Sequence, residues 1–278
     1  MLRLPVASAG AILLRKSDLE RRPSMKDDLD FTGKTVLVTG AGRNIGKAII
    51  LEFAARGANV VINSRSNRAE AEGVLREAES LGARGVVVLG DAGEKRTVDE
   101  LKSHAEEAFG RVDIYVANAA RRLYKDFWET TDEEWHRHLN QQLTGAWYLA
   151  KAFTPAMREA GYGRIIHMNG PDGYYGGWTR VPHSTAKGGL RALTKSLAEG
   201  LGEFGITVND VNPGLSDLTT HPQFGDKDTV DRIVQQIPIR RCTEPSEVAF
   251  ACAFLCSPRS AAINGSIIHL DGGRNMFG

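Results

Sequence analysis

The sequence has little of what several classes of protein require. Its 35 Lys and Arg nearly balance its 34 Asp and Glu, and a net charge of +1 creates no field that would favour nucleic acid. No apolar run reaches the roughly 18–20 residues that span a bilayer. The three cysteines lack paired spacing, which argues against a disulfide framework and for a reducing, cytoplasmic compartment. His136 and His138 are two apart on an expected helix and point in different directions, so no zinc pattern arises. We therefore expect a small-molecule substrate, with no nucleic acid, membrane or metal as partner.

Residues 1–30 differ in composition from the rest of the chain. Leu4–Leu14 is weakly apolar and is closed by basic residues, and Met25 precedes a natural-looking domain start. We expect 1–30 to be a disordered extension or an upstream mis-start, with a targeting peptide as the alternative. No linker, repeat or low-complexity block follows residue 31, so 31–278 is expected to form one domain.

Strand and helix patterns alternate from Phe31 onward. Strands are expected over 35–38, 60–62, 85–89, 112–116, 164–168, 206–211 and 266–270, and helices over 45–56, 68–81, 98–109, 133–159, 246–255 and from 183 onward. Asn169 to Pro182 is expected to be a loop. Repeated strand–helix units of this length predict an α/β fold, a single-domain Rossmann-type doubly wound parallel sheet flanked by helices.

A glycine-rich turn, TGAGRNIG over Thr39–Gly46, joins the first strand to the first helix. Glycines there let the backbone approach a phosphate, and the helix N-terminus supplies amide donors. A Walker loop needs four residues between its glycines and Ser or Thr after its lysine. Gly40 and Gly46 enclose five residues, and Ala48 follows Lys47, which disfavours nucleotide hydrolysis.

Five motifs occur in order along the chain: this turn, Asp91 after the third strand, DIYVANAA over 113–120, NPG at Asn212–Gly214 and LDGG at Leu270–Gly273. With them the chain resembles the short-chain dehydrogenase/reductase family from about Phe31 to the C-terminus. The resemblance implies a nicotinamide dinucleotide lying across the carboxyl ends of the strands. It also implies a homodimer or homotetramer.

The end of the second strand bears on the choice of cofactor. An NAD-preferring member would carry an acid there, whereas this chain has Ser64 and Arg65, which suit a 2′-phosphate. Arg43 could close over the same phosphate. The alternative is that these are surface arginines with no ligand. We predict NADP(H), and the residues expected to hold it are Gly40, Arg43, Asn44, Ile45, Gly46, Ser64, Arg65, Asp91, Asn118, Lys187, Pro213 and Gly214.

The resemblance implies that Asn, Ser, Tyr and Lys carry the chemistry, and this chain departs from that set at three positions. Trp135 and Gly145 fix the register of the long helix. The four positions, in that order, hold Gln142, Gly170, His183 and Lys187. An element that resembles Asn-Asn-Ala-Gly is also altered, to Ala117-Asn118-Ala119-Ala120.

These replacements have physical consequences. Gly170 removes a hydroxyl donor to the developing oxyanion, which typically costs about 10²–10³ in rate. The Lys187 ammonium disfavours imidazolium, so His183 is expected to be neutral near pH 7. A neutral imidazole can still donate a hydrogen bond to a carbonyl or accept a proton from an alcohol. Other groups follow the strand end where substrate would be met: Asp172, Tyr174, Tyr175 and Trp178.

Three functions are compatible with the sequence. The first is an NADP(H)-dependent oxidoreductase that interconverts a carbonyl and an alcohol, with His183 as acid/base beside Lys187. The second is a catalytically inactive protein that binds NADP(H) as a sensor or partner subunit. The third is non-redox lyase or isomerase chemistry on the same scaffold. Residues 216–235 resemble the family's variable lid, with His221 and Phe224 as the expected substrate contacts.

Overall fold

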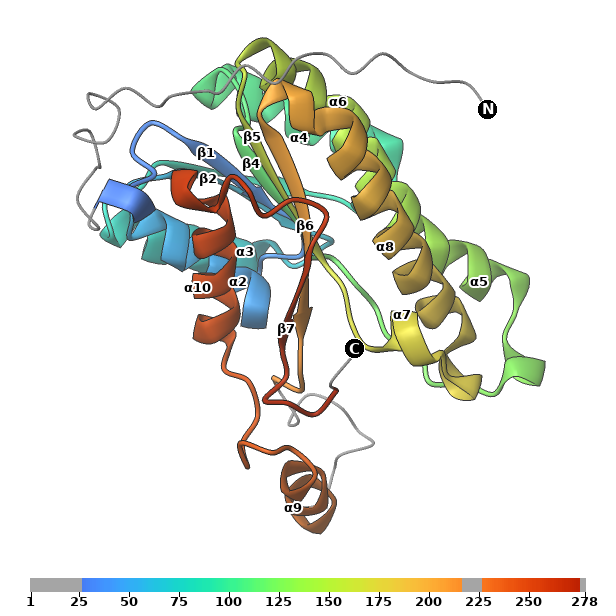
Figure 1. The fold of residues 1–278 in the computed structure, drawn as a ribbon. Coiled ribbons are helices and arrows are strands. Elements are labelled where there is room, and N and C mark those ends of the chain that lie inside the picture. The colour runs from blue at the N-terminus through green and yellow to red at the C-terminus, as the bar shows by residue number, and fades with distance from the viewer. Residues whose placement is uncertain (1–26, 217–226, 276–278) are drawn as a thin grey trace, which may run out of the picture.

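A computed structural model of the protein describes residues 27–216 and 227–275, and its fold is drawn in Figure 1. Within these residues, seven strands form one sheet in the order β3-β2-β1-β4-β5-β6-β7, and every neighbouring pair is parallel. The strands are β1 (Thr35–Val38), β2 (Asn59–Ser64), β3 (Gly85–Leu89), β4 (Ile114–Ala117), β5 (Gly163–Met168), β6 (Ile206–Pro213) and β7 (Ile267–Leu270). The order reverses between β1 and β4, which confirms the predicted doubly wound α/β fold and leaves a crevice at the carboxyl ends of those strands.

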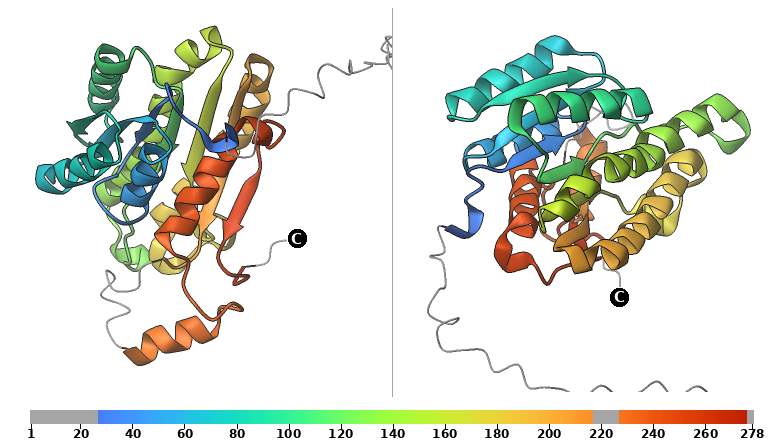
Figure 2. Two further views of the ribbon diagram at one scale, coloured as in Figure 1. Left: turned by 90° about the vertical axis from the view of Figure 1, so that its left-hand side faces the viewer. Right: turned by 90° about the horizontal axis from the view of Figure 1, so that it is seen from above.

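Helices cover both faces of this sheet, as the two views of Figure 2 show. On one face lie α2 (Asn44–Ala54), α3 (Arg68–Ser80) and α10 (Pro245–Cys256), and on the other α4 (Lys95–Phe109), α6 (Gly145–Glu159) and α8 (Val181–Leu201). Three helices lie toward the carboxyl ends of the strands in Figure 1: α5 (Asp132–Leu139), α7 (Asp172–Tyr175) and α9 (Lys227–Gln235). The 3₁₀ turns are η1 (Asp27–Leu29), η2 (Phe127–Glu129), η4 (Trp178–Arg180), η5 (Gly202–Phe204) and η7 (Pro258–Ser260).

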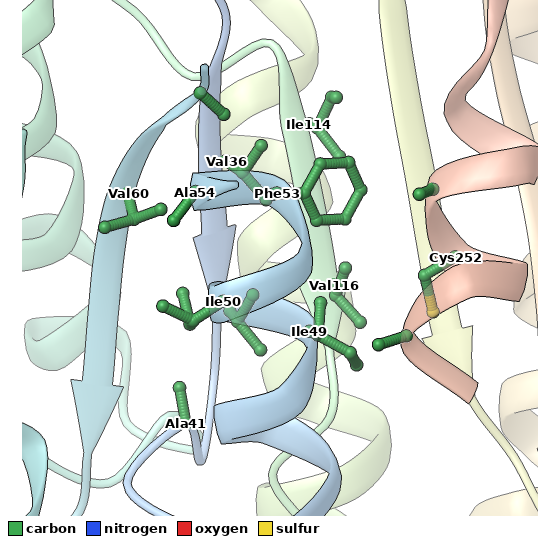
Figure 3. Close-up of a cluster of buried hydrophobic side chains, with 14 of the residues drawn as sticks. Val36, Ala41, Ile49, Ile50, Phe53, Ala54, Val60, Ile114, Val116 and Cys252 are labelled. Atoms are coloured by element: carbon green, nitrogen blue, oxygen red, sulfur yellow. The ribbon is translucent and has the colours of Figure 1, made fainter. Parts of the chain in front are cut away.

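Strand β1 is buried along its whole length, because successive side chains point to opposite faces and both faces are covered. Val36 and Val38 therefore pack into the core beneath α2. Figure 3 shows Val36 there with Ile49 and Phe53. Leu37 points into the second core, between the sheet and α4, α6 and α8. One sheet with its two helix layers thus makes a single domain, whose cores fix the strand ends that form the crevice.

The helix predicted over 133–159 is instead three elements. A π-helix, η3 (Asn140–Thr144), separates α5 from α6. A π-turn holds one more residue than an α-turn, and the amphipathic pattern on either side does not reveal it. The chain is also packed very closely here, since a Cβ on Gly145 would lie 2.6 Å from the Ala92 carbonyl oxygen. Only glycine fits at that contact.

One further expectation, the loop over Asn169 to Pro182, needs correction, and a segment for which no helix was predicted contains one. The segment Asn169 to Pro182 is not wholly loop, because it contains α7 and η4, each too short to show helical periodicity. The polar segment up to Gln235 contains α9. Of the predicted extension 1–30, only residues 27–30 lie within the described structure.

Two further features bear on membranes and on the cysteines. None of the helices in the described ranges combines the length and apolar character needed to cross a bilayer. Cys252 and Cys256 are free thiols buried in α10, where they pack as small core residues.

Candidate functional site

The glycine-rich turn leaves β1 and enters α2 at the mouth of the crevice. Gly40 has a positive φ of 63° and Asn44 one of 48°, so the backbone turns tightly twice within five residues. A Cβ on Gly46 would lie 2.4 Å from the Gly40 carbonyl oxygen, which no larger residue can relieve. The turn is therefore compact enough for an anion to reach the first amides of α2.

Asn118 ties this turn to the end of β4. Its side-chain amide donates to the carbonyl oxygens of Thr39 at 2.9 Å and Gly40 at 3.1 Å. The Thr39 hydroxyl in turn accepts from the backbone amides of Asn118 and Ala119, each at 3.0 Å. The two strand ends that border the crevice are thereby held at a fixed separation.

A cavity of about 570 Å³ opens beside the turn. Nine of the residues expected to bind NADP(H) line it: Gly40, Arg43, Asn44, Ile45, Gly46, Ser64, Arg65, Asp91 and Asn118. Arg121, which the sequence did not single out, joins them. Burial and the nearby Arg65 charge lower the pKa of Arg121. Lys47 is turned away to an ion pair with Glu77 at 2.7 Å, unlike a phosphate-binding Walker lysine.

A second cavity, of about 500 Å³, adjoins the first. Gly170, His183 and Lys187, three of the four family positions, line it. Lys187, Pro213 and Gly214, which the sequence also assigned to NADP(H), line this second cavity and not the first. The two cavities share part of their walls: Ile45, Asn118, Ala120, Arg122 and Leu215. A ligand in the first cavity can therefore reach one in the second.

His183 is buried at the start of α8, with 3% of its surface exposed. Its Nε2 lies 3.4 Å from Oδ2 of Asp172, the first residue of α7. Burial lowers the pKa of His183 to about 4, against the opposing effect of Asp172 and with help from the Lys187 charge. The predicted neutral imidazole is thus found, with burial rather than Lys187 as its main cause.

Asp172 is the partner that gives this imidazole its orientation. Burial acts to raise the pKa of Asp172, but the hydrogen bond with His183 and the Arg180 charge outweigh burial and lower it. Arg180 Nη1 lies 3.0 Å from Asp172 Oδ1. A carboxylate beside a neutral ring implies that Nε2 carries the proton, which leaves Nδ1 as an acceptor. Nδ1 has no hydrogen-bond partner among the described residues.

Lys187 lies one turn further along α8 and is 4% exposed. Its Nζ donates to the Met168 carbonyl oxygen at 2.6 Å. Burial, followed by the Arg122 charge, lowers the pKa of Lys187 to about 8. At Gly170 the space is open, because an added Cβ would meet no other heavy atom within 4 Å. The serine of the family pattern is therefore missing without any residue filling its place.

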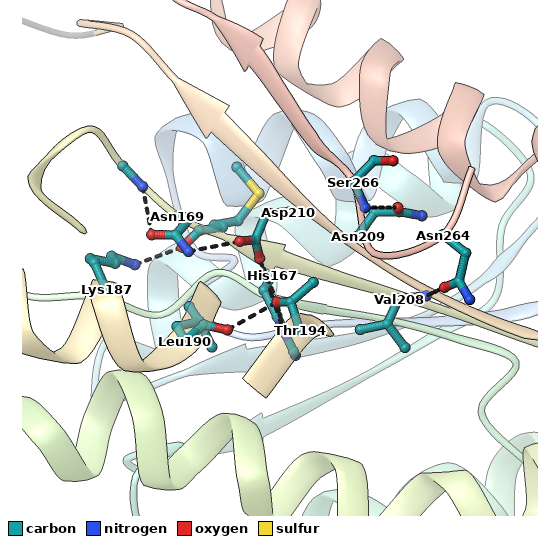
Figure 4. Close-up of polar contacts among 12 residues, drawn as sticks. His167, Asn169, Lys187, Leu190, Thr194, Val208, Asn209, Asp210, Asn264 and Ser266 are labelled. Carbon is teal, nitrogen blue, oxygen red and sulfur yellow. Dashed lines mark hydrogen bonds and ion pairs between the residues drawn. The ribbon is translucent and has the colours of Figure 1, made fainter. Parts of the chain in front are cut away.

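A buried polar network lies beneath these groups, as Figure 4 shows. Asp210 accepts from the Thr194 hydroxyl at 2.6 Å and from the Asn169 side-chain amide at 2.9 Å. His167 Nδ1 lies 2.7 Å from the same hydroxyl. Burial raises the pKa of Asp210 to about 6 and lowers that of His167 to about 3. Asn169 also accepts from the Gly170 amide at 3.0 Å, so the network fixes the backbone at the open position.

Gln142 stands apart from the other three family positions. It is buried in the π-helix and lines neither cavity. Its Nε2 donates to the Arg121 carbonyl oxygen at 3.2 Å, which places its contact at the edge of the first cavity. The structure thus brings Gly170, His183 and Lys187 together and leaves Gln142 outside.

Several residues of the cavities carried only faint signals in the sequence. The doublet Arg121–Arg122 directly follows the altered Asn118 element, and Asp172 lies two residues after Gly170. Asp210 is the one acid in β6, a strand buried along nearly its whole length, which could have flagged the network. The predicted contacts His221 and Phe224 lie outside the described residues. Within the described ranges, no group of three His, Cys, Asp or Glu side chains is placed to hold a metal ion.

The chain is similar to known proteins over nearly all of this domain. Residues 40–275 match the family model described as enoyl-(acyl carrier protein) reductase. The (2S)-[(R)-hydroxy(phenyl)methyl]succinyl-CoA dehydrogenase subunit BbsD of Thauera aromatica is 34% identical over 90% of this chain and 99% of its own. The 3-oxoacyl-[acyl-carrier-protein] reductase FabG of Escherichia coli is also 34% identical, over 89% of this chain and 100% of its own.

A solved structure agrees with these relatives. The gluconate 5-dehydrogenase of Burkholderia cenocepacia, in complex with NADP and tartrate, is 28% identical, with a TM-score of 0.82 over 90% of this chain and 98% of that one. Fold, motif order and these similarities agree, and the chain belongs to the short-chain dehydrogenase/reductase family.

Proposed function

We propose that the protein is an NADP(H)-dependent oxidoreductase that interconverts a carbonyl and an alcohol. One observation carries the proposal: the cavity that holds His183 and Lys187 shares a wall with the cavity built on the glycine-rich turn. A dinucleotide in the cavity beside the glycine-rich turn would present its nicotinamide to a substrate in the cavity that holds His183 and Lys187. The nicotinamide supplies or accepts the hydride, and the protein has to position both ligands and handle one proton.

The preference for NADP(H) rests on guanidinium groups at the end of β2. Ser64 is buried beside the turn, while Arg43 and Arg65 are exposed on the same cavity. Arg121 adds a third cation close to Arg65. Guanidinium forks bind phosphate oxygens in pairs, which suits a 2′-phosphate better than a ribose hydroxyl. A family member solved with NADP agrees with this choice.

For the proton, we assign His183 as the group that exchanges it with substrate. Asp172 orients the ring through Nε2, and the Nδ1 lone pair has no partner among the described residues. Because Nδ1 is buried, this role requires α7 to move far enough for the hydroxyl of an alcohol to reach that lone pair. The Asp172 carboxylate then stabilises the imidazolium that forms. Lys187 lies one turn along the same helix, with its ammonium held by the Met168 carbonyl oxygen, and its charge favours the release of the proton from the imidazolium. In carbonyl reduction the same steps run in reverse.

The first experiment is a thermal-shift comparison of NADP⁺, NADPH, NAD⁺ and NADH, since a ligand that binds the folded state stabilises it even without turnover. We expect larger shifts with the two phosphorylated forms. Arg65→Ala should remove that difference and leave the response to NADH unchanged. Equal shifts for all four dinucleotides in the wild type would contradict the preference.

The second experiment follows nicotinamide absorbance across a panel of ketones and alcohols. On any substrate found, His183→Ala should lower kcat by about 10²–10⁴-fold, the usual contribution of a positioned acid or base. Thr185→Ala, at an exposed position of the same helix, is the matched control. Unchanged turnover in His183→Ala would refute the role of the imidazole.

A second candidate function is that of a protein that binds NADP(H) without turnover. The open space at Gly170 supports it. No hydroxyl stands there to hold a substrate oxygen, and Gln142 lies outside the cavity. NADPH binding with no turnover on the whole panel would favour it. Turnover without a change in nicotinamide absorbance would instead indicate lyase or isomerase chemistry.

We also propose a cytoplasmic homodimer or homotetramer. Large apolar side chains are half exposed on helices that cover the sheet: Trp147, Phe250 and Phe254. Their burial between subunits would remove apolar surface from water. Light scattering of the purified protein measures the subunit number directly.

A further inference from the structure

The substrate cavity carries an excess of positive charge. Four cationic side chains line it, whereas Asp172 is the single carboxylate among the described lining residues, and His183 is neutral at pH 7. The cations are Arg122, Arg180, Lys187 and Arg274. The described lining therefore carries a formal charge of +3 in a protein whose net charge is +1.

This excess is not neutralised from within the described structure. Asp172 is already engaged by Arg180 and His183. Arg122 and Arg274 are exposed, and neither has an ion pair with any described residue. Asp271, the acid closest to Arg274 in the chain, instead accepts from the backbone amides of Gly273 and Asn275. Two guanidinium groups at the cavity are thus available to a ligand.

Arg122 also lies close to the reacting groups. Its charge is among the causes that lower the pKa of both Lys187 and His183. A cation held so near to a buried ammonium raises the cost of keeping Lys187 protonated. An anion bound at Arg122 would offset that repulsion, which gives substrate binding an electrostatic gain beyond the direct contact.

The phosphates of the cofactor do not account for these cations. The cofactor cavity has its own guanidinium groups in Arg43, Arg65 and Arg121, and it meets the substrate cavity only along a shared wall. Of the cations in the substrate cavity, Arg122 alone belongs to that wall. Arg180 and Arg274 line the substrate cavity and not the cofactor cavity.

We propose that the substrate is an alcohol or ketone that carries a carboxylate, bound by Arg122 and Arg274 at the mouth of the cavity with its reacting carbon toward His183. Carboxylates match the planar guanidinium fork with two parallel hydrogen bonds. The inference rests on the proposed oxidoreductase function. In oxidation, the carbinol carbon gives its hydride to NADP⁺ and the hydroxyl gives its proton to His183, which yields ketone, NADPH and H⁺. The carboxylate is unchanged.

Binding can be measured without turnover. The NADP⁺-loaded protein is titrated calorimetrically with malonate and succinate, which have no hydroxyl to oxidise, and with malonamide and succinamide, their neutral counterparts. We expect a dicarboxylate to bind at least about tenfold more tightly than its diamide, the ratio of one charge-assisted contact. The affinity should fall as salt is raised. Equal binding of acids and amides, or no binding of either acid, would overturn the proposal.

Variants then locate the contact. Arg122→Gln and Arg274→Gln should each weaken dicarboxylate binding by about tenfold or more, because each loses one charged partner. Arg84→Gln, an exposed arginine just before β3 at the opposite edge of the sheet, is the control and should leave it unchanged. Unchanged affinity in both cavity variants would overturn the proposal.

Two further measurements separate the possible failures. Binding of inorganic phosphate in place of both dicarboxylates would assign the site to a phosphate ester and refute a carboxylate. A thermal shift with NADP⁺ is recorded first for each variant. If the wild type shows no thermal shift with NADP⁺, the proposed cofactor is wrong. If it shows the shift but binds no dicarboxylate, only the proposed substrate class is wrong.

Discussion

The protonation state of His183 can be tested by replacing it with glutamine and following stability against pH. His183→Gln keeps an amide that can donate to Asp172 but removes the titratable ring. The pKa of His183 is about 4 in the folded protein against 6.5 for an ordinary histidine. Below pH 6.5 the unfolded chain therefore binds a proton at this ring that the folded chain does not bind. As the pH is lowered, the free energy of unfolding decreases.

The size of the effect follows from those two values. A difference between 6.5 and 4 corresponds to about 3 kcal/mol once the pH reaches 4. Between pH 7 and pH 5 it amounts to about 2 kcal/mol, because by pH 5 the unfolded ring is almost fully protonated. The wild type should lose that amount more than His183→Gln over this range. His167, which has the same sign, remains in both proteins and cancels in the comparison.

Urea unfolding at pH 7 and pH 5, followed by tryptophan fluorescence, gives the two free energies for each protein at equal concentration. His104→Gln is the matched control, since it removes an exposed histidine from α4. Equal losses of stability in the wild type and His183→Gln would show that the folded ring takes up a proton as readily as the unfolded one. The assignment of Asp172 and His183 as a carboxylate beside a neutral imidazole would then be wrong.

Three further predictions concern the same two cavities. Gly170→Ser should fold normally, since an added Cβ would meet no heavy atom within 4 Å. Its hydroxyl should raise kcat by about 10²-fold on any substrate that is turned over. An unchanged or lower kcat would show that oxyanion stabilisation does not limit the rate. Gly46→Ala should destabilise the protein by about 1–3 kcal/mol and abolish the thermal shift with NADPH, because its Cβ would fall 2.4 Å from a carbonyl oxygen; wild-type behaviour would mean that the turn is loose. Lys187→Met should abolish turnover yet raise the free energy of unfolding at pH 7 by about 1–3 kcal/mol, because the pKa of Lys187 is about 8 in the folded protein against an ordinary 10.5. The wild type regains this stability only as the pH rises from 8 to 10.5. If urea unfolding shows no gain in wild-type stability between pH 7 and pH 10, the buried ammonium is refuted.

The fold could be read from the sequence because its strands are buried on both faces. The bounds predicted for Thr35–Val38 and Gly85–Leu89 coincide with β1 and β3, where continuous apolar runs end at turn residues. The family resemblance, together with the four-residue spacing of His183 and Lys187, had grouped Gly170, His183 and Lys187, and these three residues line one cavity. These features depend on local periodicity and on the distance along one strand–loop–helix unit, which a sequence records directly.

The chemistry of the site could not be read in the same way. The Asp172–His183 pair exists because α7 folds a single turn back against α8, and one turn leaves no periodic pattern. Arg122 comes to Lys187 from a different strand end, 65 positions away in the chain. Burial, which dominates the pKa of both His183 and Lys187, is a property of the packed molecule and of no local segment.

The π-helix Asn140–Thr144 means that α5 and α6 are out of phase by one residue, as if an insertion had been accommodated within a continuous helix. Removing any one residue from this segment would allow an unbroken α-helix, but it would rotate α5 about its axis by roughly 100° relative to α6. His138, now buried on α5, would then be carried toward solvent, and the Gln142 amide would leave the Arg121 carbonyl. In any alignment with a relative whose helix is regular, the equivalences before and after this segment therefore differ by a one-residue gap.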